Sequence, residues 1–182
     1  SAPLGFKASG IHCGIRKNKS KRDLALIYCD HSCNASAVYT KNLVKGAPLI
    51  VTKENLSDFK AQAIICNSGN ANTCNADGIE KAKKMCTITA KALNINENDI
   101  IVASTGVIGQ ILPIEPIQNS INSLVQNLSK AGGNNAAKAI MTTDTLEKEI
   151  AVEFPLGENT IKIGAIAKGS GMIHPNMATM LS

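Results

Sequence analysis

Thr105 and Gly106 follow an apolar run, and their residue types suit carbonyl chemistry. A glycine at such a turn lets a backbone N–H group approach a ligand closely, and the threonine adds a hydroxyl. Such a pair can form an oxyanion hole, in which preorganised donors meet the charge that develops on a carbonyl oxygen. Glycines are also common where a strand turns, so a purely structural turn is the alternative interpretation.

A second polar segment begins at Lys168 with the sequence Lys-Gly-Ser-Gly. A lysine among small residues can bind a substrate carboxylate. The alternative is an ion pair with a protein carboxylate such as Asp144. The segment lacks the G-x-x-x-x-G-K-[ST] order of a nucleotide phosphate loop, which excludes that function. His174 stands alone and is interpreted as a structural or surface residue.

The third segment, residues 67–75, contains four asparagines in nine residues. Asparagine tolerates a left-handed backbone and bonds to its own neighbours, which favours a simple turn. The alternative is a polar wall that lines a site.

The composition indicates a globular protein, with 44% apolar and 18% charged residues. No apolar run approaches the roughly 20 residues of a membrane span. The net charge of +5 comes largely from basic clusters at residues 16–22 and 81–84, but the chain has three Phe, two Tyr and no Trp. Because stacking aromatics are scarce, we expect no nucleic-acid partner. Because no apolar run is long enough to span a bilayer, we expect no membrane partner.

Six cysteines do not form a compact disulfide framework in a chain of this size. The cluster Cys29, His31 and Cys33 lacks a second ligand pair at zinc spacing, so no metal site is expected. The first residues carry no secretory signal. These features predict reduced thiols and a cytoplasmic location.

Patterning predicts mixed strands and helices in one domain over residues 1–182, hence an α/β or α+β fold with sheets covered by helices. The expected strands are Gly10–Arg16, Leu24–Cys29, Ala35–Thr40, Leu49–Thr52, Ala61–Cys66, Asp99–Ser104 and a hairpin of Glu149–Phe154 with Thr160–Ala167. The expected helices are residues 79–93 behind a capping box at Asp77 and Glu80, residues 116–128 with Pro116 in the first turn, and residues 136–141.

Several ordered motifs together resemble one family. The final segment, Lys168-Gly-Ser-Gly-Met-Ile-His-Pro-Asn-Met-Ala-Thr-Met-Leu, is similar to the processing segment of the ornithine acetyltransferases (glutamate N-acetyltransferases, ArgJ) of arginine biosynthesis. The resemblance continues through residues 140–145, 104–109, 67–72, 36–42 and 5–10. It therefore spans nearly the whole chain.

The resemblance implies self-cleavage between Ala178 and Thr179, with Thr179 as the nucleophile of both cleavage and catalysis. By position, Thr105 and Gly106 match the oxyanion hole of the family. Lys168, Thr142 and Thr179 match its substrate-binding residues; the neighbouring Thr143 stays an alternative to Thr142.

The reaction implied is acetyl transfer from N-acetylornithine to glutamate through an acetyl-threonine intermediate, without metal or cofactor. Acetyl-CoA as a second acetyl donor stays open. After cleavage, the free α-amine of Thr179 can serve as the base for its own hydroxyl, because such amines titrate near neutrality. Two rivals are a self-cleaving aminopeptidase of similar fold, which would use serine, and a non-catalytic subunit.

The family fold is a DmpA/ArgJ-like layered α-β-β-α sandwich, so the resemblance implies an alpha chain that a second, beta chain completes, in a heterotetramer of two alpha and two beta chains. The mature first chain is expected to end at Ala178, whereas this sequence continues to Ser182. Activity of the 182 residues alone is therefore not expected.

Overall fold

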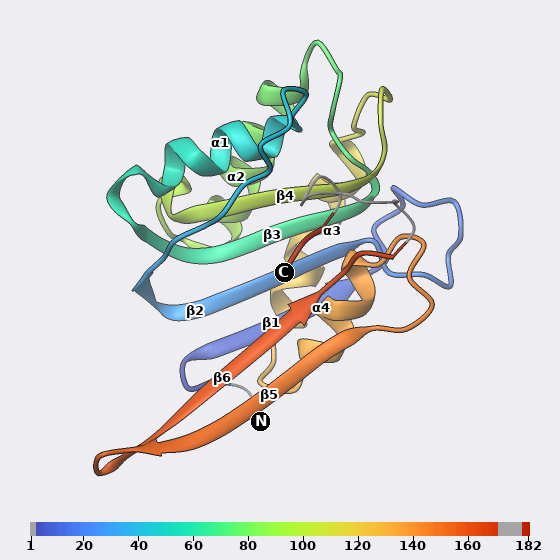
Figure 1. Cartoon of the computed structure of the whole chain (residues 1–182). Helices are drawn as coiled ribbons and strands as arrows, with labels where there is room; N and C mark the ends of the chain where they lie inside the picture. Colours follow the sequence, from blue (N-terminus) through green and yellow to red (C-terminus); the bar gives the residue numbers. More distant parts are fainter. Residues whose placement is uncertain (1–2, 171–179) are drawn as a thin grey trace.

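A four-stranded mixed sheet forms the centre of the computed structural model, which describes residues 3–170 and 180–182 (Figure 1). Its strands lie in the order β1 (Phe6–Ile11), β2 (Leu24–Asn34), β3 (Lys60–Asn70) and β4 (Ile100–Val107). The first two pairs are antiparallel and β3 pairs with β4 in parallel. The carboxyl ends of β3 and β4 therefore meet at one edge of the sheet.

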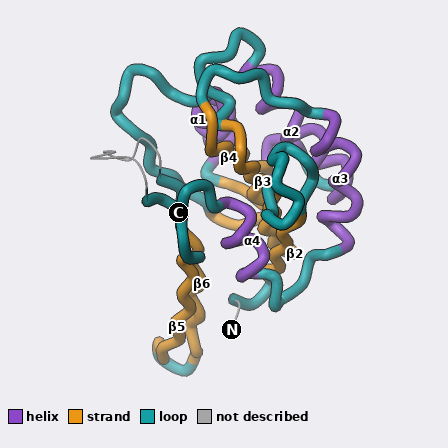
Figure 2. Tube along the Cα trace, turned by 90° about the vertical axis from the view of Figure 1, so that its right-hand side faces the viewer, coloured by secondary structure: helices purple, strands orange, loops and turns teal. Residues whose placement is uncertain are grey.

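Helices α2 (Gly78–Leu93) and α3 (Glu115–Gln126) cover one face of this sheet (Figure 2), and α1 (Ala47–Asn55) packs against α2 and β4. Short 3-10 turns at Leu56–Asp58 and Glu97–Asp99 precede β3 and β4. The main core lies between the helices and the sheet, and its largest fully buried side chains are Leu24, Leu26, Ile65, Met85, Ile100, Leu112, Ile117 and Leu124.

The opposite face of the sheet carries α4 (Gly133–Ile140) and a hairpin of β5 (Lys148–Leu156) with β6 (Asn159–Ala167). A smaller core there joins the sheet to α4 and is formed by Ala25, Cys66, Ala136, Ala139 and Ile140. The hairpin extends away from this core beyond the sheet (Figure 1).

The hairpin places its apolar residues on one face. In its register Ile150 is opposite Ala165, Val152 opposite Ile163, and Phe154 opposite Ile161. Alternation along a strand directs these pairs to the same side. All of β5 is exposed, including Phe154 at 41% and Ile150 at 65%. This chain therefore carries an apolar surface that its own described residues do not cover.

The mixed α/β layered fold that the sequence predicts is confirmed. The strands over β2, β3 and β4, the hairpin with its turn after Leu156, and helices α2 and α3 lie where the patterns place them. Pro116 occupies the first turn of α3, as expected. In the described part of the chain, no helix is long and apolar enough to cross a membrane.

Leu49–Thr52 is helical, so the strand predicted there is wrong. The residues Ala47, Pro48, Val51 and Thr52 are buried at helical spacing, a pattern that the short apolar run conceals. The Thr52 hydroxyl donates to the Val102 carbonyl at 2.7 Å and accepts from the Val102 N–H at 3.0 Å. Helix α1 thus covers the open edge of β4.

Four other expectations differ from the structure. Strand β1 ends at Ile11, so Gly10–Arg16 is mostly loop, and Ala35–Thr40 lies outside any strand. Asp77 precedes α2 without a side-chain capping bond; its carboxylate lies 3.8 Å from Lys81 instead. The last helix begins at Gly133, three residues before the expected start at Ala136.

Candidate active site

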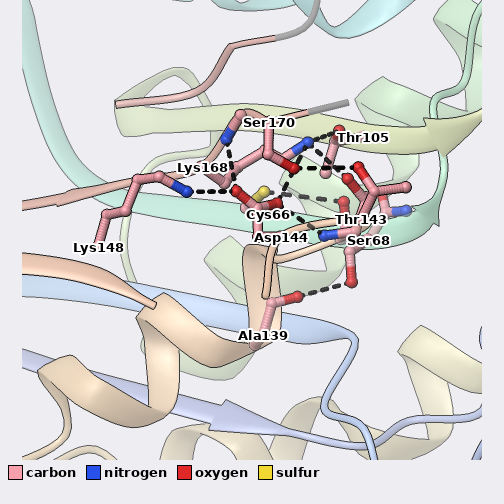
Figure 3. Close-up of polar contacts among 12 residues, drawn as sticks. Cys66, Ser68, Thr105, Ala139, Thr143, Asp144, Lys148, Lys168 and Ser170 are labelled. Carbon is pink, nitrogen blue, oxygen red and sulfur yellow. Dashed lines mark hydrogen bonds and ion pairs between the residues drawn. The ribbon is translucent and has the colours of Figure 1, made fainter. Parts of the chain in front are cut away.

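Three separate segments meet at the carboxyl ends of β3 and β4. Thr105 lies near the end of β4, Thr142 and Asp144 follow α4, and Lys168 directly follows β6. Figure 3 shows the side chains of Thr105, Asp144 and Lys168 converging on one polar cluster. The structure therefore brings together Thr105, Thr142 and Lys168, which the sequence analysis selected and which lie far apart along the chain.

The ammonium of Lys168 lies at the centre of this cluster and is buried, with 4% of the residue exposed. It donates to the Thr142 hydroxyl at 2.6 Å and to the Thr105 hydroxyl at 3.3 Å. An ammonium has three donors. Among the described residues these two hydroxyls are its hydrogen-bond acceptors, which leaves one N–H for a further acceptor.

The same bonds orient the two threonines. Each hydroxyl oxygen accepts from Lys168, and within the described part of the chain neither hydroxyl donates to another group, so each proton can be donated to a ligand. Thr143 differs: its side chain contacts Ser170 at 3.3 Å and is exposed. The geometry therefore distinguishes between the two adjacent threonines and places Thr142 against the lysine.

Asp144 is the buried counter-charge of the cluster, and its side chain is fully inaccessible. It accepts from Lys148 Nζ at 2.7 Å, from the Gly169 N–H at 2.8 Å and from the Thr142 N–H at 3.2 Å. Its distance to Lys168 Nζ is 3.9 Å. Asp144 therefore fixes the backbone on both sides of the site, and its shortest ion pair is with Lys148.

Burial and charge act in opposite directions on these two groups. Burial alone would raise the pKa of Asp144, but hydrogen bonds from Lys148, Gly169 and Thr142 outweigh it and hold that pKa well below its usual value. Burial lowers the pKa of Lys168, and Asp144 partly opposes this shift. The site thus holds a carboxylate that stays ionised beside a partly desolvated lysine.

Gly106 follows Thr105 in a backbone conformation that disfavours other residues, with φ at 136°. It faces Gly69 of β3, where the pairing of the two strands becomes irregular. A side chain at Gly106 would place its Cβ 2.4 Å from the Gly69 carbonyl carbon and 2.6 Å from the Asn70 nitrogen. Glycine is required here because the two strands approach too closely for a Cβ.

Gly106→Ala is expected to lower the free energy of unfolding by about 2–4 kcal/mol, from the strained backbone and from overpacking against β3. Urea-induced unfolding measures this change. The matched control is Gly109→Ala, which also has a positive φ (78°) but has no atom within 4 Å of the added Cβ. Equal destabilisation by both variants would show that contact with β3 is unimportant.

The asparagines of residues 67–75 form hydrogen bonds that hold the backbone around the site. Asn67 is fully buried in β3 and accepts from the Ser104 hydroxyl at 2.6 Å. Asn70 donates to the carbonyls of Gln110 and Ile111, and Asn75 to that of Gln110. The interpretation of this segment as a simple turn is therefore wrong for residues 67–70, which belong to strand β3. These amides fix the chain that follows Gly106.

Cys66 and Ser68 are neighbours of the cluster that the sequence analysis did not select (Figure 3). Ser68 donates to the Ala139 carbonyl at 2.7 Å and so ties β3 to α4. Burial raises the pKa of the Cys66 thiol to about 12, and Lys168 opposes the shift. A thiol in that state is not a nucleophile near neutral pH. Their alternation on β3 is the sequence signal that could have placed them.

Arg16 reaches the site from the loop between β1 and β2, another contact that the sequence did not indicate. Its guanidinium Nη2 donates to the Thr142 carbonyl at 3.2 Å. The loop is held by the buried carboxylate of Asp23, which accepts backbone N–H groups from Cys13 (2.5 Å), Gly14 (3.2 Å) and Arg16 (2.8 Å). Asp23 therefore fixes the backbone position from which the Arg16 side chain extends to the site.

Ala178 and Thr179 lie outside the described residues. The described chain on either side of residues 171–179 is at the site: Leu181 forms an antiparallel bridge with Lys168, with N–O distances of 2.8 and 3.2 Å. Among the residues that the structure describes, no three His, Cys, Asp or Glu side chains gather as they would to hold a metal ion.

Two solved structures share the fold of this chain. The chain superposes on the arginine biosynthesis bifunctional protein ArgJ of Bacillus halodurans with a TM-score of 0.89 and 40% identity, covering 98% of this chain and 92% of that one. It superposes equally well, with a TM-score of 0.89 and 33% identity, on Mycobacterium tuberculosis ornithine acetyltransferase complexed with ornithine, covering 99% and 94%.

The chain belongs to the ArgJ family, whose sequence profile matches residues 7–182. It is 53% identical over 181 residues to the arginine biosynthesis bifunctional protein ArgJ of Caldanaerobacter subterraneus subsp. tengcongensis, covering 99% of this chain and 44% of that protein. It is 46% identical over 185 residues to the chloroplastic ArgJ of Oryza sativa subsp. indica, covering 100% and 40%. The chain thus spans less than half the length of these relatives.

Proposed function

We propose that this chain is the first part of a glutamate N-acetyltransferase that moves an acetyl group from N-acetylornithine to glutamate in arginine biosynthesis. One observation carries the proposal: buried Lys168 lies between the hydroxyls of Thr142 and Thr105, and its third N–H has no acceptor among the described residues. That arrangement suits a carboxylate-bearing substrate whose acyl carbonyl must be polarised nearby. The ornithine-bound relative with the same fold supports the substrate class.

Lys168 and Thr142 are proposed to bind the substrate carboxylate. The spare N–H of Lys168 and the free proton of the Thr142 hydroxyl are two donors on adjacent groups. Hydrogen bonds from an ionised donor to a carboxylate are shorter and stronger than neutral ones. Ion pairing of Lys168 with Asp144 is the weaker alternative, because the separation is 3.9 Å and Asp144 has three nearer partners.

Thr105 and Gly106 are proposed to form the oxyanion hole. Lys168 donates to the Thr105 hydroxyl oxygen, so the hydroxyl proton is available for the oxygen of a tetrahedral intermediate. The backbone N–H of Gly106 would supply the second donor. The rigid contact between Gly106 and β3 would hold both donors in place, which is what preorganisation requires.

Thr179 is proposed as the nucleophile. In the precursor its hydroxyl attacks the Ala178 carbonyl, and the C–N bond between Ala178 and Thr179 breaks to give an ester and a free α-amine. Water then hydrolyses the ester, which releases the Ala178 carboxylate and restores the Thr179 hydroxyl. In the exchange, the Thr179 hydroxyl attacks the acetyl carbonyl of N-acetylornithine. The C–N bond breaks and ornithine leaves with the proton that the α-amine has taken. The amine of glutamate then attacks the acetyl ester, and the hydroxyl is restored.

The remaining parts of the proposal concern assembly. A second chain from the same precursor, beginning at Thr179, is proposed to complete the site in a cytoplasmic heterotetramer of two alpha and two beta chains. The matched relatives are more than twice as long as this chain, which supports a further segment. No cofactor is required by this chemistry, and acetyl-CoA is proposed as a second acetyl donor because relatives are named bifunctional.

The test is turnover by the two segments produced together, first with N-acetylornithine plus glutamate and then with acetyl-CoA plus glutamate. We expect acetyl exchange in the first assay. Release of free amino acids from peptides, without exchange, would instead support the self-cleaving aminopeptidase. Neither activity in a correctly assembled complex would support the non-catalytic subunit.

Thr105→Ala is expected to reduce kcat for exchange by about 10²–10³-fold, the usual loss for one oxyanion donor. The melting temperature should stay near that of the unchanged protein. Thr105→Ser is the matched control, since it keeps the hydroxyl and should keep most of the rate. Unchanged kcat in the alanine variant would exclude the Thr105 hydroxyl from the reaction.

A further inference from the structure

Residues 16–22, here named the basic loop, connect β1 to β2 and contain Arg16, Lys17, Lys19, Lys21 and Arg22. Within residues 3–170 and 180–182, none of these five side chains forms an ion pair with a carboxylate. The proposed acetyl exchange uses none of the three lysines. The three lysines therefore add positive charge that neither an ion pair among these residues nor the proposed reaction explains.

Two cavities lie along the basic loop. One, of about 300 Å³, is lined by His12, Lys19, Lys21, Arg22, Asn127 and Asn135, among others, and none of its described lining residues carries a carboxylate. The other, of about 200 Å³, shares Lys21 and Arg22 and adds Arg16 and Lys138. Its one carboxylate is Glu147, which pairs with Lys138 at 3.6 Å. Five cationic side chains thus face two adjoining cavities.

The loop backbone is held in place before any ligand binds. Asp23 fixes its first part, as described above. Asn18 Oδ1 accepts from the Ser20 N–H at 3.0 Å and from the Ser20 hydroxyl at 2.7 Å. Arg22 Nε donates to the Gly10 carbonyl at 2.9 Å, which holds its guanidinium against β1. A preorganised loop loses little conformational entropy on binding.

From these observations we propose that the basic loop and its two cavities bind a phosphate-bearing ligand. A single carboxylate would neutralise only a fraction of this charge, whereas a diphosphate carries several negative charges and many acceptor oxygens. Guanidinium groups match phosphate geometry with paired N–H donors, and lysines add point charges. The larger cavity is also of the size of small-molecule sites, which begin at roughly 300 Å³.

The second cavity adjoins the candidate active site, because Arg16 both lines it and donates to the Thr142 carbonyl. A ligand with its phosphates in the basic loop could therefore extend toward Lys168. Two sources share this chemistry: a nucleotide-bearing thiol that carries an acyl group, and a free phosphate compound. Only the first source rests on the proposed acetyl transfer.

The test is calorimetric titration of pyrophosphate into the two segments produced together, at low ionic strength. We expect saturable binding, and Lys19→Gln with Lys21→Gln should weaken it by about tenfold or more. The control is Lys84→Gln with Lys91→Gln, which removes the same charge from the exposed side of α2 and should change affinity by less than about twofold. Circular dichroism verifies the fold of both variants.

Absence of pyrophosphate binding in the unchanged protein would overturn the proposal, as would equal weakening by both double variants. Displacement of bound pyrophosphate by coenzyme A would assign the site to a nucleotide-bearing thiol. Binding without displacement would support the site and assign it to free phosphate compounds. Acetyl exchange is measured on the same preparation, so a failure of the proposed enzyme activity is distinguishable from a failure of phosphate binding.

Discussion

Replacing Lys168 with methionine is expected to raise the KM for N-acetylornithine by about 10–100-fold, because a hydrogen bond to a charged group contributes roughly 1.5–3 kcal/mol. Methionine fills most of the buried volume but lacks the ammonium. Asp144 keeps Lys148 and two backbone N–H groups as partners. The melting temperature without ligand should therefore change little, and the increase that glutamate causes should disappear.

Lys148→Met is the matched comparison, since Lys148 makes the shortest ion pair with Asp144, at 2.7 Å. It should lower the melting temperature while the glutamate-induced increase persists. The pKa of Asp144 is lowered in the folded protein. The stability that this carboxylate contributes is therefore fully present above its unfolded pKa of about 3.9, and it is lost as the pH falls from that value through the lower folded pKa. A Lys168→Met protein with the full glutamate-induced increase would refute substrate binding by Lys168.

Thr179→Ala in the complete precursor is expected to prevent both self-cleavage and acetyl exchange, because one hydroxyl serves both steps. Loss of a catalytic nucleophile reduces kcat by on the order of 10⁴-fold or more. Cys66 cannot replace it, since burial keeps that thiol protonated. Gel electrophoresis follows cleavage and single-turnover acetylation follows the chemistry.

Thr179→Ser is the control for this residue. It keeps a hydroxyl on the same backbone and should retain partial cleavage and exchange. Efficient separation of the precursor into two chains by the alanine variant would disprove a shared nucleophile.

Much of the fold could be predicted from the sequence, because long patterns carry enough information. Helix α2 repeats its apolar residues at helical spacing over four turns, and the hairpin alternates around an evident turn. Short segments failed for a physical reason: a four-residue apolar run such as Leu49–Thr52 fits a buried strand and a buried helix equally well. The helical form of α1 is favoured by its contact with the edge of β4, where Thr52 bonds to the backbone of Val102. The sequence does not reveal that contact.

The candidate site divides in the same way. Thr105, Gly106, Thr142 and Lys168 could be selected by residue type and resemblance, and the structure brings them together. From the sequence, Asp144 is expected only as an alternative ion-pair partner of Lys168. Its bonds to Lys148 and to two backbone N–H groups, and the contributions of Arg16 and Asp23, could not be foreseen, because they depend on which groups a charge meets after folding. Partners of that kind are separated by up to 126 residues, as for Arg16 and Thr142.

The apolar face of the hairpin has a consequence for how the protein is made. A two-stranded ribbon is marginally stable by itself, and its uncovered edges and apolar residues pair readily with other chains. If one precursor supplies both segments, the second segment is covalently linked to the first while the hairpin folds. Its effective concentration near the apolar face of the hairpin is then higher than separate synthesis would reach. Production of the first segment alone should therefore yield aggregates, and co-synthesis with the second should keep it in solution.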